Sequence, residues 1–196
     1  MEMKMRISDF DTDASPAALR WPIVSLDFES SGLQALTYPI EVGLASWAGP
    51  EQPIIVWSTL IKPTEEWVLN GHWDPAAEPI HNIPRTALSS GLSPDDALDQ
   101  LHQRIGVGGI ALCDGGKFDH YWLKRLAQAA QADPLFFLGP WDTLEAALSF
   151  PQMQRLHDFA GSHTVPHRAG PDAALNIQAF AFALGLDIPE IIQSNQ

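Results

Sequence analysis

The chain has 196 residues, 45% of them hydrophobic, with a formal net charge of −13 and a single cysteine. This length and composition predict one globular domain, and a single cysteine excludes a disulfide framework. The negative charge excludes a surface that follows a long phosphate backbone, so any contact with nucleic acid is expected to be short and local.

The two ends of the chain differ from its middle in composition. Residues 1–20 are polar without a sustained period and are expected to be a loosely ordered lead-in; residues 21–188 form the single domain, and 189–196 a tail. No run approaches the ~18 apolar residues of a membrane span, and the N-terminus lacks the apolar core of a signal peptide. We therefore expect a cytoplasmic protein without membrane contact.

The first predicted element is a short buried strand within residues 23–32, which ends at a Ser-Ser-Gly turn and should lie in mid-sheet. Side chains alternate faces along a strand, so Asp27 and Glu29 point the same way and Phe28 points to the other face. Such paired carboxylates raise each other's pKa unless a cation lies between them, and Mg²⁺ or Mn²⁺ suits oxygen ligands. Taken alone, the pair also fits two acids in a solvated loop.

The next segments continue the sheet and then cover it. Residues 41–47 and 54–61 predict strands that form a meander with the first one. Residues 62–83, rich in proline and tryptophan, predict short helices and an irregular loop over one face. Trp67 and Trp73 in this segment are expected to be core or lid aromatics, with stacking on bases as the alternative.

A scaffold helix and a fourth strand come next. Ser93 and Pro94 are typical of a helix N-terminus, and this helix is expected to end before Gly106. The apolar run 109–113 predicts the fourth strand, and residues 135–138 are a candidate for the fifth.

Two later helices each carry an acid on their apolar side. Asp119 leads a stripe that continues through Trp122 and Leu126, and Asp172 leads the stripe of the last helix. Acids seldom face inward without a partner. His167 lies in the loop that precedes the last helix, five residues before Asp172.

Four inward acids and one histidine therefore stand at the ends of predicted elements. Carboxylates fit an oxygen-ligand site for two divalent ions, and a neutral imidazole beside them can accept a proton from water. The residues are Asp27, Glu29, Asp119, Asp172 and His167.

Three segments resemble the three exonuclease motifs of the DEDDh 3′-to-5′ exonucleases, the group of proofreading subunits, ribonuclease T and oligoribonuclease. They are Asp27-Phe28-Glu29-Ser30-Ser31-Gly32, Phe118-Asp119 and His167-Arg168-Ala169-Gly170-Pro171-Asp172-Ala173. Two weaker resemblances are Pro79-Ile80-His81-Asn82-Ile83 to the family's Ile-His-Gly-Ile and Trp141-Asp142-Thr143-Leu144 to its Asp-Thr-Leu helix start. Gly115 departs from the family, where asparagine is common four residues before the third acid.

The resemblance implies a ribonuclease-H-like α/β fold, with a mixed, twisted five-stranded sheet flanked by helices. It also implies two divalent cations, Mg²⁺ or Mn²⁺. Asp27, Glu29 and Asp172 would hold one cation, and Asp27 would also contact a second that Asp119 reaches directly or through water. His167 would be the general base for the attacking water.

The resemblance further implies a set of substrate contacts near the 3′ end of a nucleic acid. Ser31, Gly32 and Leu33 would line the terminal nucleotide. Lys117 and Arg168 flank the site and would meet phosphate, although exposed solubilising charge is an equal alternative for each. The complete set is Phe28, Ser31, Gly32, Leu33, His81, Lys117 and Arg168.

The expected function is metal-dependent 3′-to-5′ exonuclease activity on single-stranded DNA or RNA, with release of nucleoside monophosphates. The alternatives are an oligoribonuclease-like activity on very short RNA and a non-catalytic nucleic-acid-binding or interaction module of the same fold. A zinc pair of His163 and His167 is disfavoured because Pro166 interrupts a helix there. DNA or RNA preference, substrate length, pathway, and monomeric or homodimeric state stay open.

Overall fold

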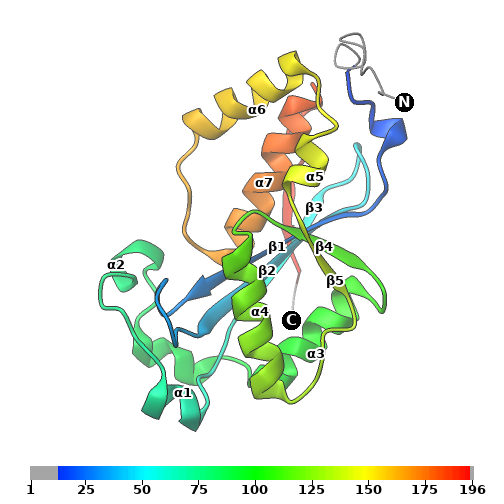
Figure 1. Ribbon diagram of the computed structural model, residues 1–196. Helices are drawn as coiled ribbons and strands as arrows, with labels where there is room; N and C mark the ends of the chain where they lie inside the picture. Colours follow the sequence, from blue (N-terminus) through cyan, green and yellow to red (C-terminus); the bar gives the residue numbers. More distant parts are fainter. Residues whose placement is uncertain (1–12, 195–196) are drawn as a thin grey trace, which may run out of the picture.

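The computed structural model describes residues 13–194 as a sheet with helices on both faces (Figure 1). The strands are β1 (Ile23–Ser30), β2 (Pro39–Trp47), β3 (Ile54–Leu60), β4 (Ile110–Cys113), β5 (Phe137–Pro140) and β6 (Ile191–Gln193). The helices are α1 (Glu65–Asn70), α2 (Glu78–His81), α3 (Pro94–Ile105), α4 (Lys117–Ala130), α5 (Asp142–Glu145), α6 (Phe150–Ser162) and α7 (Ala169–Ala183), with 3-10 turns at Pro16–Ala18 and Arg85–Ser90. None of the helices in this part of the chain is long and apolar enough to cross a membrane.

The sheet is mixed and has the strand order β5-β4-β1-β2-β3-β6. β1, β2 and β3 form the predicted antiparallel meander, and the remaining pairs are parallel. This confirms the expected ribonuclease-H-like α/β architecture, with one strand more than the five predicted. The sixth strand comes from the segment expected to be a tail: Ile191 and Ile192 pair with the outer edge of β3, where β-branched residues are favoured.

The predicted lead-in lies mainly outside the described residues, which begin at residue 13. Its last part is tied to the start of α6. Ser149 Oγ donates a hydrogen bond to Asp13 Oδ1 (2.6 Å), and Gln152 Nε2 donates to the carbonyl of Ala14 (3.0 Å). These side-chain contacts join segments far apart in sequence, so local pattern alone could not indicate them.

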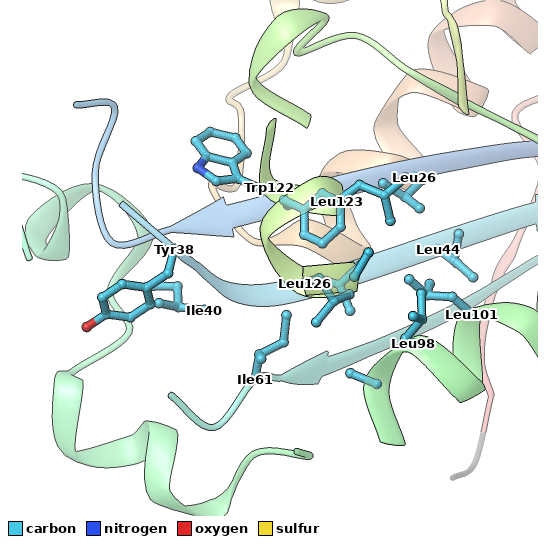
Figure 2. Packing of buried hydrophobic residues seen from close by; sticks show 14 of the residues in the cluster. Leu26, Tyr38, Ile40, Leu44, Ile61, Leu98, Leu101, Trp122, Leu123 and Leu126 are labelled. Carbon is cyan, nitrogen blue, oxygen red and sulfur yellow. The ribbon is translucent and has the colours of Figure 1, made fainter. Parts of the chain in front are cut away.

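Two apolar cores lie on the two faces of the sheet. The larger core packs α3 and α4 against one face and includes Leu26, Leu98 and Leu126 (Figure 2). Trp67 is also part of it, 2% exposed and stacked on Tyr38, as expected for a core aromatic. The smaller core packs α7 against the opposite face, with α6 beside α7.

Gly43 of β2 allows the first turn of α7 to lie directly on the sheet. A Cβ atom at this position would stand 2.2 Å from the backbone carbon of Ala169 and from the backbone nitrogen of Gly170. We expect Gly43→Ala to lower the free energy of unfolding by about 1–3 kcal/mol, because backbone must move to admit the methyl group. Chemical denaturation measures the change. Gly49→Ala is the control, since no described atom lies within 4 Å of its added Cβ, and equal losses in both variants would contradict the account.

Candidate metal centre and catalytic cleft

The candidate site lies where β1 continues past its pairing with β4. The pairing joins Ser25 to Leu112, and Asp27 follows two residues later. Leu26 and Phe28 belong to the core on the α4 face, whereas Asp27 and Glu29 line a cleft with Asp172 of α7. The alternation predicted for this strand is therefore present, and it places both carboxylates on the α7 side.

Carboxylates meet there in two groups that share Asp27. Asp27, Glu29 and Asp172 each place an oxygen within 4.8 Å of the others, and Asp27, Asp114 and Asp119 do the same. The structure thus brings together all four acids predicted from the sequence. It adds Asp114, which was not predicted from the sequence. The signal that could have found it is its position directly after the fourth strand, since the acids of the first motif also stand near the end of a strand.

The carboxylate of Asp119 is buried, which is unusual for an acidic side chain. Its residue is 1% exposed, and neither carboxylate oxygen has a well-formed hydrogen bond among the described residues; the nearby Cys113 thiol and the Gly115 and Phe28 backbones only partly offset the effect of burial on its pKa. Asp172 Oδ1 is likewise buried without a partner in the described part of the chain. Buried carboxylates without hydrogen bonds are costly, and a divalent cation is the natural partner for a set of carboxylate oxygens. The donor set therefore fits Mg²⁺ or Mn²⁺.

Gly115, the departure from the family motif, is explained by the position of Asp119. A Cβ atom at Gly115 would lie 2.5 Å from Asp119 Oδ2. Any side chain at this position, asparagine included, would force the carboxylate to move. Glycine at position 115 therefore leaves the space that the Asp119 carboxylate occupies.

Burial and mutual repulsion raise the pKa of every acid predicted for the site. Burial, followed by the charge of Asp172, raises the pKa of Glu29 to about 8. Burial, followed by the charge of Asp114, raises the pKa of Asp119 to about 7, and burial raises that of Asp172 to about 6. Burial and then the charge of Asp119 raise the pKa of Asp27 well above its usual range. Without cations, the cluster therefore holds protons near neutral pH.

These raised pKa values predict a pH dependence of stability. Carboxyl groups titrate near pH 4 in an unfolded chain, so between about pH 4 and pH 8 the folded protein binds more protons, and its unfolding free energy falls as pH rises. Divalent cations replace the protons, so their stabilising effect should grow over the same range. We expect Mn²⁺ to raise the melting temperature more at about pH 8 than at about pH 5, and Glu29→Gln to flatten the pH dependence measured in chelator. Equal Mn²⁺ shifts at both pH values would contradict this expectation.

Four of the acids border a cleft of about 260 Å³ between the end of β1 and the start of α7, whereas the buried Asp119 does not line it. His167 lines this cleft and is exposed to solvent. Its backbone has a φ of +53°, in the left-handed region that residues other than glycine seldom adopt. This conformation sets the imidazole at the cleft immediately before α7 begins. Besides His167, the cleft is bordered by Asp27, Phe28, Glu29, Asp114, Val165, Asp172, Leu175 and Asn176.

Arg168 is engaged by a buried glutamate. Glu41, opposite Glu29 in the β1–β2 register, is 1% exposed. The Nε of Arg168 donates to Glu41 Oε2 (2.9 Å), its Nη2 donates to Oε1, and the backbone N–H of Ala169 donates to Oε2 (3.0 Å). Glu41 thereby anchors the residue after His167 and the first residue of α7. The phosphate contact implied for Arg168 stays a prediction.

The residues implied for the terminal nucleotide lie in the loop that joins β1 to β2. Ser31 is fully buried, and its Oγ donates to the carbonyl of His72 (2.7 Å) and accepts from the Tyr38 N–H (3.0 Å). Gly32 has a φ of +145° and packs against Asp74, whereas Leu33 is 67% exposed. Ser31 thus fixes the loop, and Leu33 is the member free to touch a ligand.

Two further residues predicted to contact the substrate, His81 and Lys117, do not line the cleft. His81 is 2% exposed, and its Nδ1 accepts a hydrogen bond from the Ile83 N–H (3.0 Å). Lys117 is exposed at the start of α4, with its Nζ 5.2 Å from the centre of the Phe118 ring. Their roles in substrate binding stay predictions.

Comparison with known proteins identifies the fold from structure alone. No protein-family model and no curated protein sequence matches the chain. Among solved structures, Pop2p of S. pombe in its Mg²⁺- and Mn²⁺-bound form is 16% identical, with a TM-score of 0.57 and 81% of each chain covered. E. coli exonuclease I in complex with a dA16 oligonucleotide is 17% identical (TM-score 0.61), with 84% of this chain and 41% of that chain covered.

A third similar structure is a 3′-exonuclease that recognises the 3′ end of the histone mRNA stem-loop, 12% identical with a TM-score of 0.59. The match covers 85% of this chain and 65% of that one. The chain therefore spans less than half of exonuclease I, but most of Pop2p. At these identities the likeness establishes the fold. The chain is structurally similar to the DEDD 3′-to-5′ exonucleases and has their ribonuclease-H-like fold.

Proposed function

We propose that this chain is a metal-dependent 3′-to-5′ exonuclease that releases nucleoside monophosphates from single-stranded DNA or RNA. The observation that carries the proposal is the convergence of two carboxylate groups on Asp27, with His167 beside them in one cleft. Similar folds support it: Pop2p was solved with Mg²⁺ and Mn²⁺, exonuclease I was solved with a dA16 oligonucleotide, and the 3′-exonuclease recognises the 3′ end of the histone mRNA stem-loop.

The four acids predicted from the sequence would hold two divalent cations. Glu29 and Asp172 would bind the first and Asp119 the second, with Asp27 common to both. Cations bound in this way lower the pKa of water and neutralise the charge that develops on the attacking and leaving oxygens of a phosphodiester. The raised pKa values of the acids mean that protons leave the site when cations bind.

His167 would take the proton from the attacking water on an imidazole nitrogen. Its charge lowers the pKa of Asp172, so the two side chains attract each other when both are ionised. Asp172 therefore stabilises the imidazolium that forms as His167 accepts the proton. Glu41 accepts hydrogen bonds from Arg168 and from the Ala169 N–H, and these bonds fix the loop that carries His167 at the start of α7. The acids are thus held by packed elements, and the loop that carries His167 is anchored through its neighbours Arg168 and Ala169, as positioned catalysis requires.

The proposed substrate follows from charge and site shape. A net charge of −13 gives the surface little attraction for a long duplex backbone. Asp27, Glu29 and Asp172 border a small cleft at a strand end, which suits one chain end better than a long duplex. A single-stranded 3′ terminus meets both conditions.

The test is nucleotide release from single-stranded DNA and RNA of graded length, labelled at the 3′ or the 5′ end, with Mg²⁺, Mn²⁺ or chelator. We expect metal-dependent release of monophosphates from the 3′ end. Activity confined to RNA of a few nucleotides would favour the oligoribonuclease-like alternative. Binding without cleavage of any substrate, by folded protein that binds Mn²⁺, would favour the non-catalytic module.

A further inference from the structure

We propose that Asp114 is a fifth metal ligand, which completes a three-carboxylate site for the second cation together with Asp27 and Asp119. The inference deepens the proposed function and rests on it for the catalytic meaning of the site. The geometry of the free protein carries the inference itself.

The first observation is the position of Asp114 at the end of β4. It directly follows Cys113, the last residue of the strand, and it borders the catalytic cleft. One of its carboxylate oxygens lies within 4.8 Å of oxygens of both Asp27 and Asp119. Like charges repel at this separation, and a cation between the three carboxylates would offset that repulsion.

The second observation is the unsatisfied side chain of Asp119. This residue is 1% exposed, and neither carboxylate oxygen has a well-formed hydrogen bond among residues 13–194, although the nearby Cys113 thiol and the Gly115 and Phe28 backbones lower its pKa. Gly115 leaves just enough room for this carboxylate, since a Cβ there would lie 2.5 Å from Oδ2. Asp119 is therefore a buried polar group directed at Asp27 and Asp114, and a cation between the three satisfies all of them.

The consequence concerns how the second cation is held. With Asp114, each cation has three carboxylates, and Asp27 is common to both sets. Without it, the second cation would have two. We infer that both cations bind the free protein before nucleic acid arrives. Five carboxylates around two dications also leave one negative charge uncompensated, which favours retention of metal over attraction of phosphate.

The test counts Mn²⁺ ions bound to the free protein, without nucleic acid, by calorimetric titration and by the paramagnetic resonance signal of unbound Mn²⁺. Wild-type protein should bind two ions. Asp114→Asn should keep the first site unchanged and weaken the second at least ~10-fold, as expected for loss of a group that supports a metal site. Asp133→Asn, which neutralises an exposed acid beyond the end of α4, is the matched control and should bind as wild type.

The titration separates this inference from the proposed function. Two sites of wild-type affinity in Asp114→Asn would overturn the inference, whatever the nuclease activity. Equal weakening of both sites would also overturn it, because Asp114 belongs to one group alone. Selective weakening of the second site in a protein that cleaves no nucleic acid would uphold the inference and overturn the proposed function. In an active enzyme, the variant should need at least ~10-fold more Mn²⁺ for half-maximal rate.

Discussion

The Asp27→Asn variant is expected to lose nucleotide release by a factor on the order of 10³ or more, because one side chain serves both cations. Asp27 belongs to each of the two carboxylate groups. An amide has the same shape but offers a single neutral oxygen, so both sites lose charge together. The rate is measured from 3′-labelled single strands at saturating Mn²⁺.

The same variant should remain folded. Burial and the neighbouring charge of Asp119 raise the pKa of Asp27, so the native site already favours a neutral side chain at this position when cations are absent. We therefore expect the melting temperature of Asp27→Asn in chelator to be no lower than that of wild type, and its Mn²⁺-induced rise to be lost. Asp158→Asn, an exposed acid on α6, is the control. A wild-type rate in Asp27→Asn would show that chemistry takes place elsewhere.

The second large effect is expected at the histidine of the cleft. His167→Asn should lower the rate about 10²–10⁴-fold, as loss of a general base does. Asparagine is chosen because it tolerates the left-handed backbone that His167 adopts, with a φ of +53°. Mn²⁺ binding should be retained, since the histidine is outside both carboxylate groups.

His163→Asn provides a matched control for this experiment. His163 lies four residues earlier, stacked on Phe159 with its Nδ1 2.8 Å from the Phe159 carbonyl oxygen, and it does not line the cleft. We expect its rate to stay near that of wild type. Loss of Mn²⁺ binding in His167→Asn, or equal rate losses in the two variants, would remove His167 from the role of base.

Much of the site could be predicted because periodicity places side chains. Alternation along a strand puts Asp27 and Glu29 on one face, and the helical period puts Asp119 on the buried side of α4 with Trp122 and Leu126. These rules are local, so they hold without knowledge of the fold. The four acids meet because α4 and α7 each bring a carboxylate to those of β1.

Other features depend on contacts between distant segments. Asp114 stands in a Gly-rich turn and follows no period, so its approach to Asp27 emerges only when β4 is placed beside β1. The pairing of Arg168 with Glu41 requires both the register of β2 and the position of α7. The β6 strand has three residues and gains its hydrogen bonds from β3 rather than from a pattern of its own.

The most direct test of the central claim is a single-turnover reaction of excess protein with a 3′-labelled single strand, in Mn²⁺ and in chelator. Release of the labelled terminal nucleotide as a 5′-monophosphate in the first cleavage, in Mn²⁺ alone and not by Asp27→Asn, is the predicted result. First products that retain the 3′ label on longer fragments, or equal release by wild type and Asp27→Asn, would contradict hydrolysis from the 3′ end at this carboxylate centre.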